Sequence, residues 1–276
     1  MWRGGFRTTV VAAVSVLVAT VGVLTVAGAA PAATTTTGIN DQFNGTKLDL
    51  TNWQYFPSQG CVSPSNVKVS GGYLHLITTK KNCGERIGTK QTFQYGVVTA
   101  SIYFDLQPGA HTGMTLFGAS GTWPRNGEID IAEQIGRQPN TDSVRVWTQR
   151  LSSTTAQRCG TSLDLPATVN HQWHTYGINW QPGNITFYLD GKAIWYWAAW
   201  EAALFGCSYP FDDPGYQGRV YFTSSVGGQY AGPALPGHPG YPLNTLVDYI
   251  TIAPPTPTPT PTPSSAPAAT SGVAGR

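Results

Sequence analysis

The chain has 276 residues, of which 11% are charged, and a formal net charge of +2 at pH 7. No stripe of Lys and Arg runs along the sequence, which argues against a nucleic acid as its partner. Part of the small positive charge lies in the N-terminal segment, so charge alone predicts no other class of partner.

The N-terminal segment has the layout of a secretory signal peptide. Arg3 and Arg7 precede an uncharged apolar run at residues 10–26, and several alanines follow it up to Ala33. A membrane anchor is the alternative, because the run is only slightly short of a spanning helix. The Ala-Pro-Ala-Ala exit favours cleavage. We therefore expect residues 1–33 to be removed and the protein to be secreted, with no membrane association afterwards.

The middle of the chain, residues 38–253, predicts one all-β domain. Short runs of β-branched and aromatic residues alternate with Gly, Pro, Asn and Asp, and almost no helical periodicity is present. The clearest strands are expected at residues 72–79, 97–105, 143–148, 174–180, 185–189, 192–197, 219–226 and 246–252. Asp190-Gly191 predicts a hairpin between two of them, and residues 198–205 predict a short helix. This pattern indicates a sandwich or a barrel.

The cysteines and the C-terminal tail fit an exported protein. Cys61, Cys83, Cys159 and Cys207 suggest two disulfides, and three pairings are open. We favour nearest-neighbour pairing, Cys61 with Cys83 and Cys159 with Cys207. Residues 254–276 alternate Pro and Thr before ending in small residues, which predicts an extended linker or tail.

Three carboxylates crowd into one predicted strand. Only four glutamates occur in the chain, yet Glu128 and Glu133 stand five residues apart with Asp130 between them. Carboxylates are disfavoured in strands, and neighbouring like charges repel. The alternative is an acidic strand edge in solvent, but the remaining residues of this strand, Ile129, Ile131 and Ala132, are apolar. We therefore interpret the three acids as a catalytic group.

The spacing of these acids predicts a β-bulge. Glu128 and Asp130 share one face of a regular strand, whereas Glu133 would point to the other. One extra residue near Ile131-Ala132 would return Glu133 to the same face. Two carboxyl groups about 5–5.5 Å apart would then suit retaining glycoside hydrolysis, in which one attacks the anomeric carbon and the other protonates the leaving oxygen. The order along the strand leaves the two roles open.

The segment from Trp123 to Glu133 resembles the motif of glycoside hydrolase family 16. The resemblance implies a β-jelly-roll, concanavalin-like sandwich with a concave substrate cleft. It also implies that Glu128 is the nucleophile, that Asp130 assists it and that Glu133 is the acid/base. The two residues between Asp130 and Glu133 resemble the bulged, laminarinase-like branch. Weaker matches follow in the expected order: residues 94–96, 173–176, Trp180, residues 188–191, residues 226–228 and residues 247–249.

Three departures from the family pattern bear on the substrate. Ser101 stands near the place of a usual Arg, and residues 113–117 replace a Trp-Pro-Ala strand that often lines the cleft. A His that laminarinases often carry on the strand after the catalytic one is absent, with Trp147 and Gln149 nearby. The catalytic residues are thus intact, whereas a simple β-1,3-glucan specificity is not implied.

Other side chains complete the predicted site. Trp123 resembles a sugar-stacking Trp of the family, and the 9 Trp and 13 Tyr of the chain suit a cleft that stacks sugar rings. Trp147, Gln149 and Gln229 are candidates for substrate contact, with Arg150 beside them. Asp248 resembles a position that helps to bind a structural Ca²⁺ in some relatives, although no cofactor is required. We interpret His174 and Trp180 as packing residues, and His111 and His171 as ordinary surface or loop residues.

We therefore expect a monomeric, retaining endo-glycoside hydrolase that acts on a β-linked polysaccharide, either a β-1,3-glucan or a mixed β-1,3/1,4-glucan. A galactan-active hydrolase or a transglycosylase with the same carboxylates is the first alternative. A carbohydrate-binding, lectin-like module is the alternative of another class. Such a module has no need of three acids in an apolar strand, which favours the enzyme.

Overall fold

The computed structural model of the chain describes residues 38–56, 64–79, 85–105, 109–136, 142–153, 155, 157–166, 169, 171–226 and 242–255. The predicted signal peptide, Cys61, Cys83, Gln229 and most of the Pro/Thr-rich tail lie outside these residues. Within the described part, none of the helices has the length and apolar character needed to cross a lipid bilayer.

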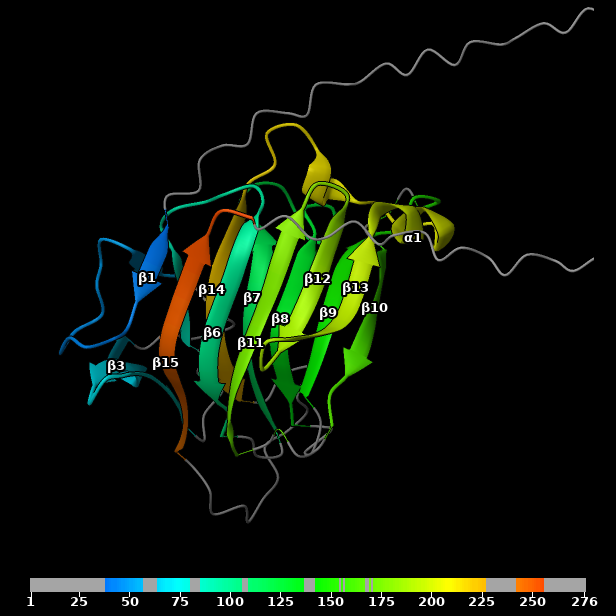
Figure 1. Cartoon of the computed structure of the whole chain (residues 1–276). Coiled ribbons are helices and arrows are strands. Elements are labelled where there is room, and N and C mark those ends of the chain that lie inside the picture. Colours follow the sequence, from blue (N-terminus) through cyan, green and yellow to red (C-terminus); the bar gives the residue numbers. More distant parts are fainter. Residues whose placement is uncertain are drawn as a thin grey trace, which may run out of the picture. The chain divides into compact units, whose positions relative to one another are not determined.

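Two antiparallel sheets lie face to face (Figure 1). The eight-stranded sheet has the order β13-β12-β11-β6-β15-β4-β3, with β1 paired to β15. Its strands are β1 (Ile39–Asp41), β3 (Val67–Ser70), β4 (Tyr73–Thr78), β6 (Gly96–Tyr103), β11 (Trp173–Gln181), β12 (Asn184–Leu189), β13 (Lys192–Ala198) and β15 (Leu243–Ala253).

The seven-stranded sheet has the order β10-β9-β8-β7-β14-β5-β2. Its strands are β2 (Trp53–Tyr55), β5 (Glu85–Thr89), β7 (Ala110–Gly118), β8 (Glu128–Ile135), β9 (Asp142–Gln149), β10 (Arg158–Asp164) and β14 (Gly218–Val226). The helix α1 (Ala199–Leu204) follows β13, and short 3₁₀ turns occur at Pro64–Asn66 and Pro210–Asp212. All the strands predicted from the sequence are present, and the sandwich that they imply is confirmed.

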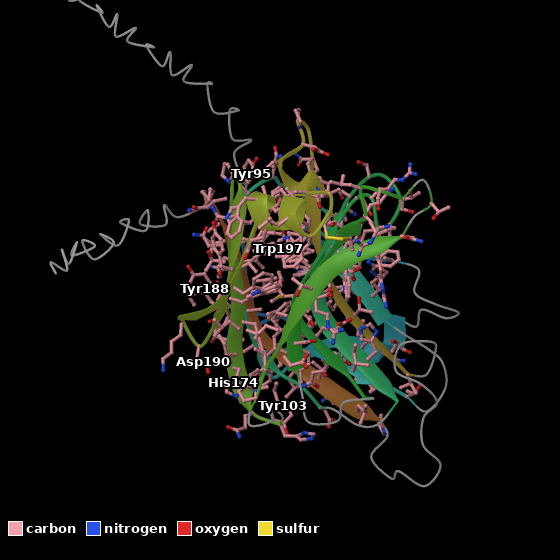
Figure 2. All side chains as sticks on the ribbon, turned by 90° about the vertical axis from the view of Figure 1, so that its right-hand side faces the viewer. Tyr95, Tyr103, His174, Tyr188, Asp190 and Trp197 are labelled. Carbon is pink, nitrogen blue, oxygen red and sulfur yellow. A yellow bond between two sulfur atoms is a disulfide. The ribbon has the colours of Figure 1, made fainter. Side chains whose placement is uncertain are left out.

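Alternating residues of both sheets fill the space between them, as half-buried strands require. Large aromatic side chains dominate this core: Trp53, Trp180 and Trp197 are fully buried. The ring of Trp180 packs against Tyr95 at 5.3 Å and Tyr216 at 5.7 Å, measured between ring centroids, so its predicted packing role is confirmed. Trp197, labelled in Figure 2, stacks on Phe205 beside α1.

One disulfide joins two distant segments. Cys159 on β10 is bonded to Cys207, which follows α1, and 48 positions separate the two residues. This pairing confirms half of the predicted disulfide framework. Because β10 is the edge strand of the seven-stranded sheet and α1 follows β13 of the other sheet, the bond ties the two layers together at one end.

Candidate active site

A β-bulge in β8 brings the three predicted carboxylates to one face. On β7, Met114 and Thr115 pair with Ala132 and Asp130, so Ile131 is the extra residue of β8. The register against β9 shifts at the same place, between Asp130 and Glu133. The predicted bulge is therefore confirmed. We call the outer face of the seven-stranded sheet, which carries Glu128, Asp130 and Glu133, the carboxylate face.

The turn before β8 positions Glu128. Gly127 has a φ of +70°, and a Cβ added to it would lie 2.6 Å from the ring of Phe211. Only glycine suits such a place, because it lacks a Cβ and tolerates positive φ. From the same turn Trp123 donates its indole N–H to Glu128 Oε2 at 2.6 Å, while 42% of its surface stays exposed. Trp123 therefore holds a carboxylate as well as offering a ring to solvent.

Asp130 is the most enclosed of the three acids, with 1% of its surface exposed. Thr115 on β7 donates its hydroxyl to Asp130 Oδ1 at 2.9 Å. Burial raises the pKa of Asp130 well above its usual value, and the charges of Glu133 and Glu128 act in the same direction. The side chain of Asp130 also lies within hydrogen-bond range of Glu128.

Glu133 is held between His111 and Arg145, one from each neighbouring strand. His111 Nε2 on β7 lies 2.7 Å from Glu133 Oε1, and Arg145 Nε on β9 lies 2.9 Å from Oε2. Burial raises the pKa of Glu133, but the hydrogen bond and charge of His111 and the charge of Arg145 outweigh it and leave the pKa below its usual value. The unliganded site thus favours ionised Glu133.

For Glu128, in contrast to Glu133, the effects that raise the pKa outweigh those that lower it. Burial raises the pKa of Glu128 to about 7, and the charge of Glu133 adds to this, while hydrogen bonds from Trp123 and Asp130 oppose it. Since the charge of one glutamate changes the pKa of the other, the pair titrates as a unit. The arrangement supplies two carboxylates with different proton affinities on one face, which is what acid-assisted nucleophilic attack requires.

The interpretation of His111 as an ordinary surface residue is wrong, and Arg145 was not singled out by sequence. In an antiparallel ladder His111 pairs with Ile135, and so its ring reaches Glu133 diagonally across two residues. Neither contact follows from local spacing, since 22 positions separate His111 from Glu133. The period of two in residues 143–148 would have placed Arg145 on the same face as Trp147.

The other predicted site residues are dispersed. Trp147 pairs directly with Glu128 and lies on the carboxylate face, as expected. Gln149 is tied to Ser153 O through its side-chain amide, at 3.3 Å. His174 lies at the inward-facing side of β11, where its Nδ1 is 2.8 Å from Asp190 Oδ2, and His171 is largely exposed. Gln229 is outside the described residues, so its role stays a prediction.

Asp248 is exposed on β15 of the other sheet. In the described residues the structure holds no group of three or more His, Cys, Asp or Glu side chains that could bind a metal ion. The residues present therefore do not make a calcium site by side chains alone, and a structural Ca²⁺ at Asp248 stays a prediction.

Comparisons with known proteins agree with this geometry. Residues 58–232 match the family described as glycosyl hydrolases family 16. The chain is 26% identical over 262 residues to glucan endo-1,3-beta-glucosidase A1 of Niallia circulans, covering 77% of this chain and 37% of that protein. It is 28% identical over 142 residues to a beta-glucanase of Rhodothermus marinus, covering 48% of this chain and 46% of that protein. The chain thus spans less than half the length of these relatives.

Solved structures share the fold. The laminarinase catalytic domain from Thermotoga maritima MSB8 superposes with a TM-score of 0.68 at 20% identity, covering 79% of this chain and 98% of that chain. The laminarinase from Rhodothermus marinus superposes with a TM-score of 0.67 at 22% identity, covering 79% and 97% respectively. The sandwich of the present chain is therefore the jelly roll of those enzymes.

Proposed function

Since the chain belongs to the glycosyl hydrolases of family 16, we propose that it is a retaining endo-hydrolase that cleaves a β-linked polysaccharide by double displacement. The observation that carries this proposal is the bulge in β8. It sets Glu128, Asp130 and Glu133 on one face of an interior strand whose other side chains, except Gln134, are apolar. No structural role of the fold accounts for three acids there.

In the proposed mechanism Glu128 attacks the anomeric carbon. Trp123 fixes one of its oxygens at 2.6 Å, and a hydrogen bond with Asp130 stabilises its negative charge. Glu133 gives a proton to the leaving oxygen, which releases one part of the polymer and leaves a glycosyl ester on Glu128. Glu133 then takes a proton from water, and the water hydrolyses that ester with net retention.

The proton distribution of the unliganded site differs from the one that the first step needs. The contacts of Glu133 with His111 and Arg145 favour its ionised form, whereas burial favours a proton on Glu128. In a coupled pair a proton can move from one carboxylate to the other without a change in the number of protons bound. We infer that the reacting form is a minor member of the one-proton population, in which the proton lies on Glu133 and Glu128 is ionised.

The named relatives support a glucan as substrate, with β-1,3 or mixed β-1,3/1,4 linkages. Secretion fits the same proposal, because disulfides such as Cys159–Cys207 persist in oxidising compartments. A galactan-active hydrolase or a transglycosylase would use the same three carboxylates, and only product analysis separates these reactions.

The test is a reducing-sugar assay on laminarin, lichenan, agarose and xyloglucan with the wild type and Glu128→Ala. Release of product by the wild type and its loss in the variant are expected. If both proteins bound a polymer and neither cut any, the chain would be a binding module and the proposal would fail.

Azide rescue assigns the two roles. With an aryl β-oligosaccharide, Glu128→Ala plus azide should give a glycosyl azide of inverted configuration, because azide takes the place of the nucleophile. Glu133→Ala plus azide should give the retained product. The reverse pattern would exchange the two roles, in agreement with the resting proton distribution.

A further inference from the structure

The arginines of the described chain gather on one side of the molecule. Arg86 lies on β5, Arg145 on β9, Arg158 on β10 and Arg219 on β14, all strands of the seven-stranded sheet. The remaining two described arginines, Arg125 and Arg150, lie in the turn before β8 and directly after β9. The eight-stranded sheet carries no arginine in its described strands, only Lys68 and Lys192.

Strand register places four of these side chains on the carboxylate face itself. Arg145 pairs directly with Asp130. Arg219 pairs with Phe117, which pairs with Glu128, and Arg86 pairs with Thr223, which is linked through Gly113 to Glu133. Arg158 pairs with Gln149, two residues beyond Trp147. Because directly paired residues point to the same side of a sheet, all four project beside the carboxylates.

Three of the four guanidinium groups lie over aromatic rings of this face. Arg86 Cζ is 4.1 Å from the ring centroid of Tyr221, and Arg158 Cζ is 4.8 Å from that of Trp147. Arg219 Cζ is 5.0 Å from the ring centroid of Phe56. A stacked guanidinium is held by its face and keeps its N–H edge for oxygen ligands, which suits planar recognition of carboxylate or sulfate.

Two glycines make room for these stacks. A Cβ at Gly88 would lie 2.7 Å from the ring of Tyr221. One at Gly160 would overlap Val146 O and would lie 2.8 Å from the ring of Trp147. The rings therefore lie over glycine positions of the adjacent strands, and arginines cover them.

The positive charge of this face is only partly matched by the protein. Arg145 is paired with Glu133. By contrast, Arg86 and Arg219 have no carboxylate within 4.0 Å among the described residues, and their Nε atoms are buried without a hydrogen-bond partner. An oxyanion at the guanidinium edge of either arginine would supply the ion-pair partner that the described residues do not.

A second positively charged region lies at the other end of Glu128. Arg125 and Arg150 line a pocket of about 560 Å³, together with Gln149 and the half-buried Tyr209. The hydroxyl of Tyr209 is buried and has no hydrogen-bond partner in the described structure. Among the described residues that line this pocket, Asp213 is the one carboxylate. The pocket thus offers guanidinium, amide and hydroxyl donors within reach of the turn that carries Trp123.

We propose that the polysaccharide cut by this site is acidic, and that its sulfate-ester or carboxylate groups bind to the arginines on either side of the catalytic carboxylates. Arg86 and Arg219 bind such groups on the β14–β5 side, and Arg125 and Arg150 bind them at the pocket. This inference rests on the proposed glycoside hydrolase function and narrows its substrate class.

The test compares laminarin and lichenan with the same polymers after light sulfation or carboxymethylation. The kcat/KM of the wild type is expected to be at least about tenfold higher on one acidic derivative than on its neutral parent, with an advantage that falls as NaCl screens the charges. The sulfated and carboxymethylated arms identify the preferred anion. Dextran sulfate, an α-linked polyanion, should bind the inactive Glu128→Gln variant more weakly than that derivative does.

Two substitutions test which arginines produce the preference for the acidic derivative. Arg219→Gln and Arg150→Gln should each lower kcat/KM on the acidic derivative about tenfold or more. Lys192→Gln removes the same charge from the other sheet and should leave kcat/KM on the acidic derivative unchanged. Equal thermal midpoints for the three variants would exclude misfolding as the cause.

Equal or higher kcat/KM on the neutral parents, or equal binding of dextran sulfate, would overturn the acidic substrate and leave the hydrolase standing. Failure of the wild type to cut any polymer, neutral or acidic, would instead overturn the hydrolase and this inference with it.

Discussion

The outer faces of the two sheets differ in chemistry although their inner faces are alike. Both inner faces are lined with Val, Ile, Leu, Phe and Trp. The outer face of the eight-stranded sheet carries neutral groups such as Thr99, Thr175 and Tyr188, which line a pocket of about 270 Å³. Figure 2 labels Tyr188 on that side of the sandwich. The carboxylate face carries three acids, His111 and four arginines.

This difference shows that the fold constrains the inner faces of the sheets more than their outer faces. Burial of the inner faces drives the sandwich to form and depends on apolar area, not on what the outer side chains are. Charged side chains packed on a sheet cost free energy through desolvation and like-charge repulsion. The larger cost at the carboxylate face fits the proposal that this face is the functional side.

The largest effect should follow the loss of one carboxylate. Glu128→Gln keeps the shape of the side chain and removes the nucleophile, so kcat should fall on the order of 10⁴-fold or more in a reducing-sugar assay. The matched control is Glu201→Gln on α1, whose side-chain oxygen can still accept the bond from Ala198 N. Activity of Glu128→Gln equal to that of the control would remove Glu128 from the mechanism.

Removal of the disulfide tests how much the covalent link between the two sheets stabilises the fold. Breaking Cys159–Cys207, which closes 48 positions of chain, should lower the free energy of unfolding by about 4 kcal/mol. Chemical denaturation of Cys159→Ser/Cys207→Ser beside the wild type measures this. A midpoint that does not move would mean that the edge of the carboxylate sheet is fixed by packing alone.

Substitution of Arg145 tests how the positive charge on the carboxylate face affects the pKa of Glu133. Arg145→Gln removes one cation from Glu133, so the pKa of Glu133 should rise. The acidic limb of the pH profile of kcat/KM should then move to higher pH, while the basic limb, set by the pKa of Glu128 at about 7, should stay near its place. A uniform loss of rate at every pH would instead show that Arg145 only supports the strand.

The smallest expected effects concern stability and pH, and they have opposite signs on the two sheets. The raised pKa of Glu128 means that the folded state holds its proton more tightly than the unfolded state, so stability should fall as the pH rises from about 4.5 to about 7. In Glu128→Gln this fall should be smaller. Thermal melts of both proteins across that range measure it.

Asp190 on the other sheet behaves in the opposite way. Burial raises its pKa, but hydrogen bonds from Thr175 and His174 outweigh this and lower it. The contribution of Asp190 to the free energy of unfolding should be present above the usual pKa of an aspartate. It should be lost as the pH falls through the lowered pKa of the folded state. Because Asp190 is about half exposed, solvent screening keeps the effect small. Asp190→Asn should therefore change the melting midpoint only at the edge of detection.

Sequence predicted the parts of the molecule that depend on neighbouring positions. Strand period, turn residues and the count between Asp130 and Glu133 gave the sandwich, the hairpin at Asp190-Gly191 and the bulge. Contacts between strands that are distant along the chain could not be predicted from the sequence. His111 and Arg145 reach Glu133 only through the pairing of β7 and β9 with β8, a register that no single segment encodes.

The bulge at Ile131 also bears on how such sequences can diverge. Loss of one codon, for Ile131 or Ala132, would leave Glu, Asp and Glu at every second position of a regular strand, with all three still on the outer face. Residues after the deletion would keep their sides, since the extra residue of β8 has no partner of its own on β7. A single in-frame deletion is therefore a step between the bulged and unbulged forms of the catalytic strand that leaves the sheet pairing intact. The length of this strand is free to change by one residue in a place where most strands tolerate none.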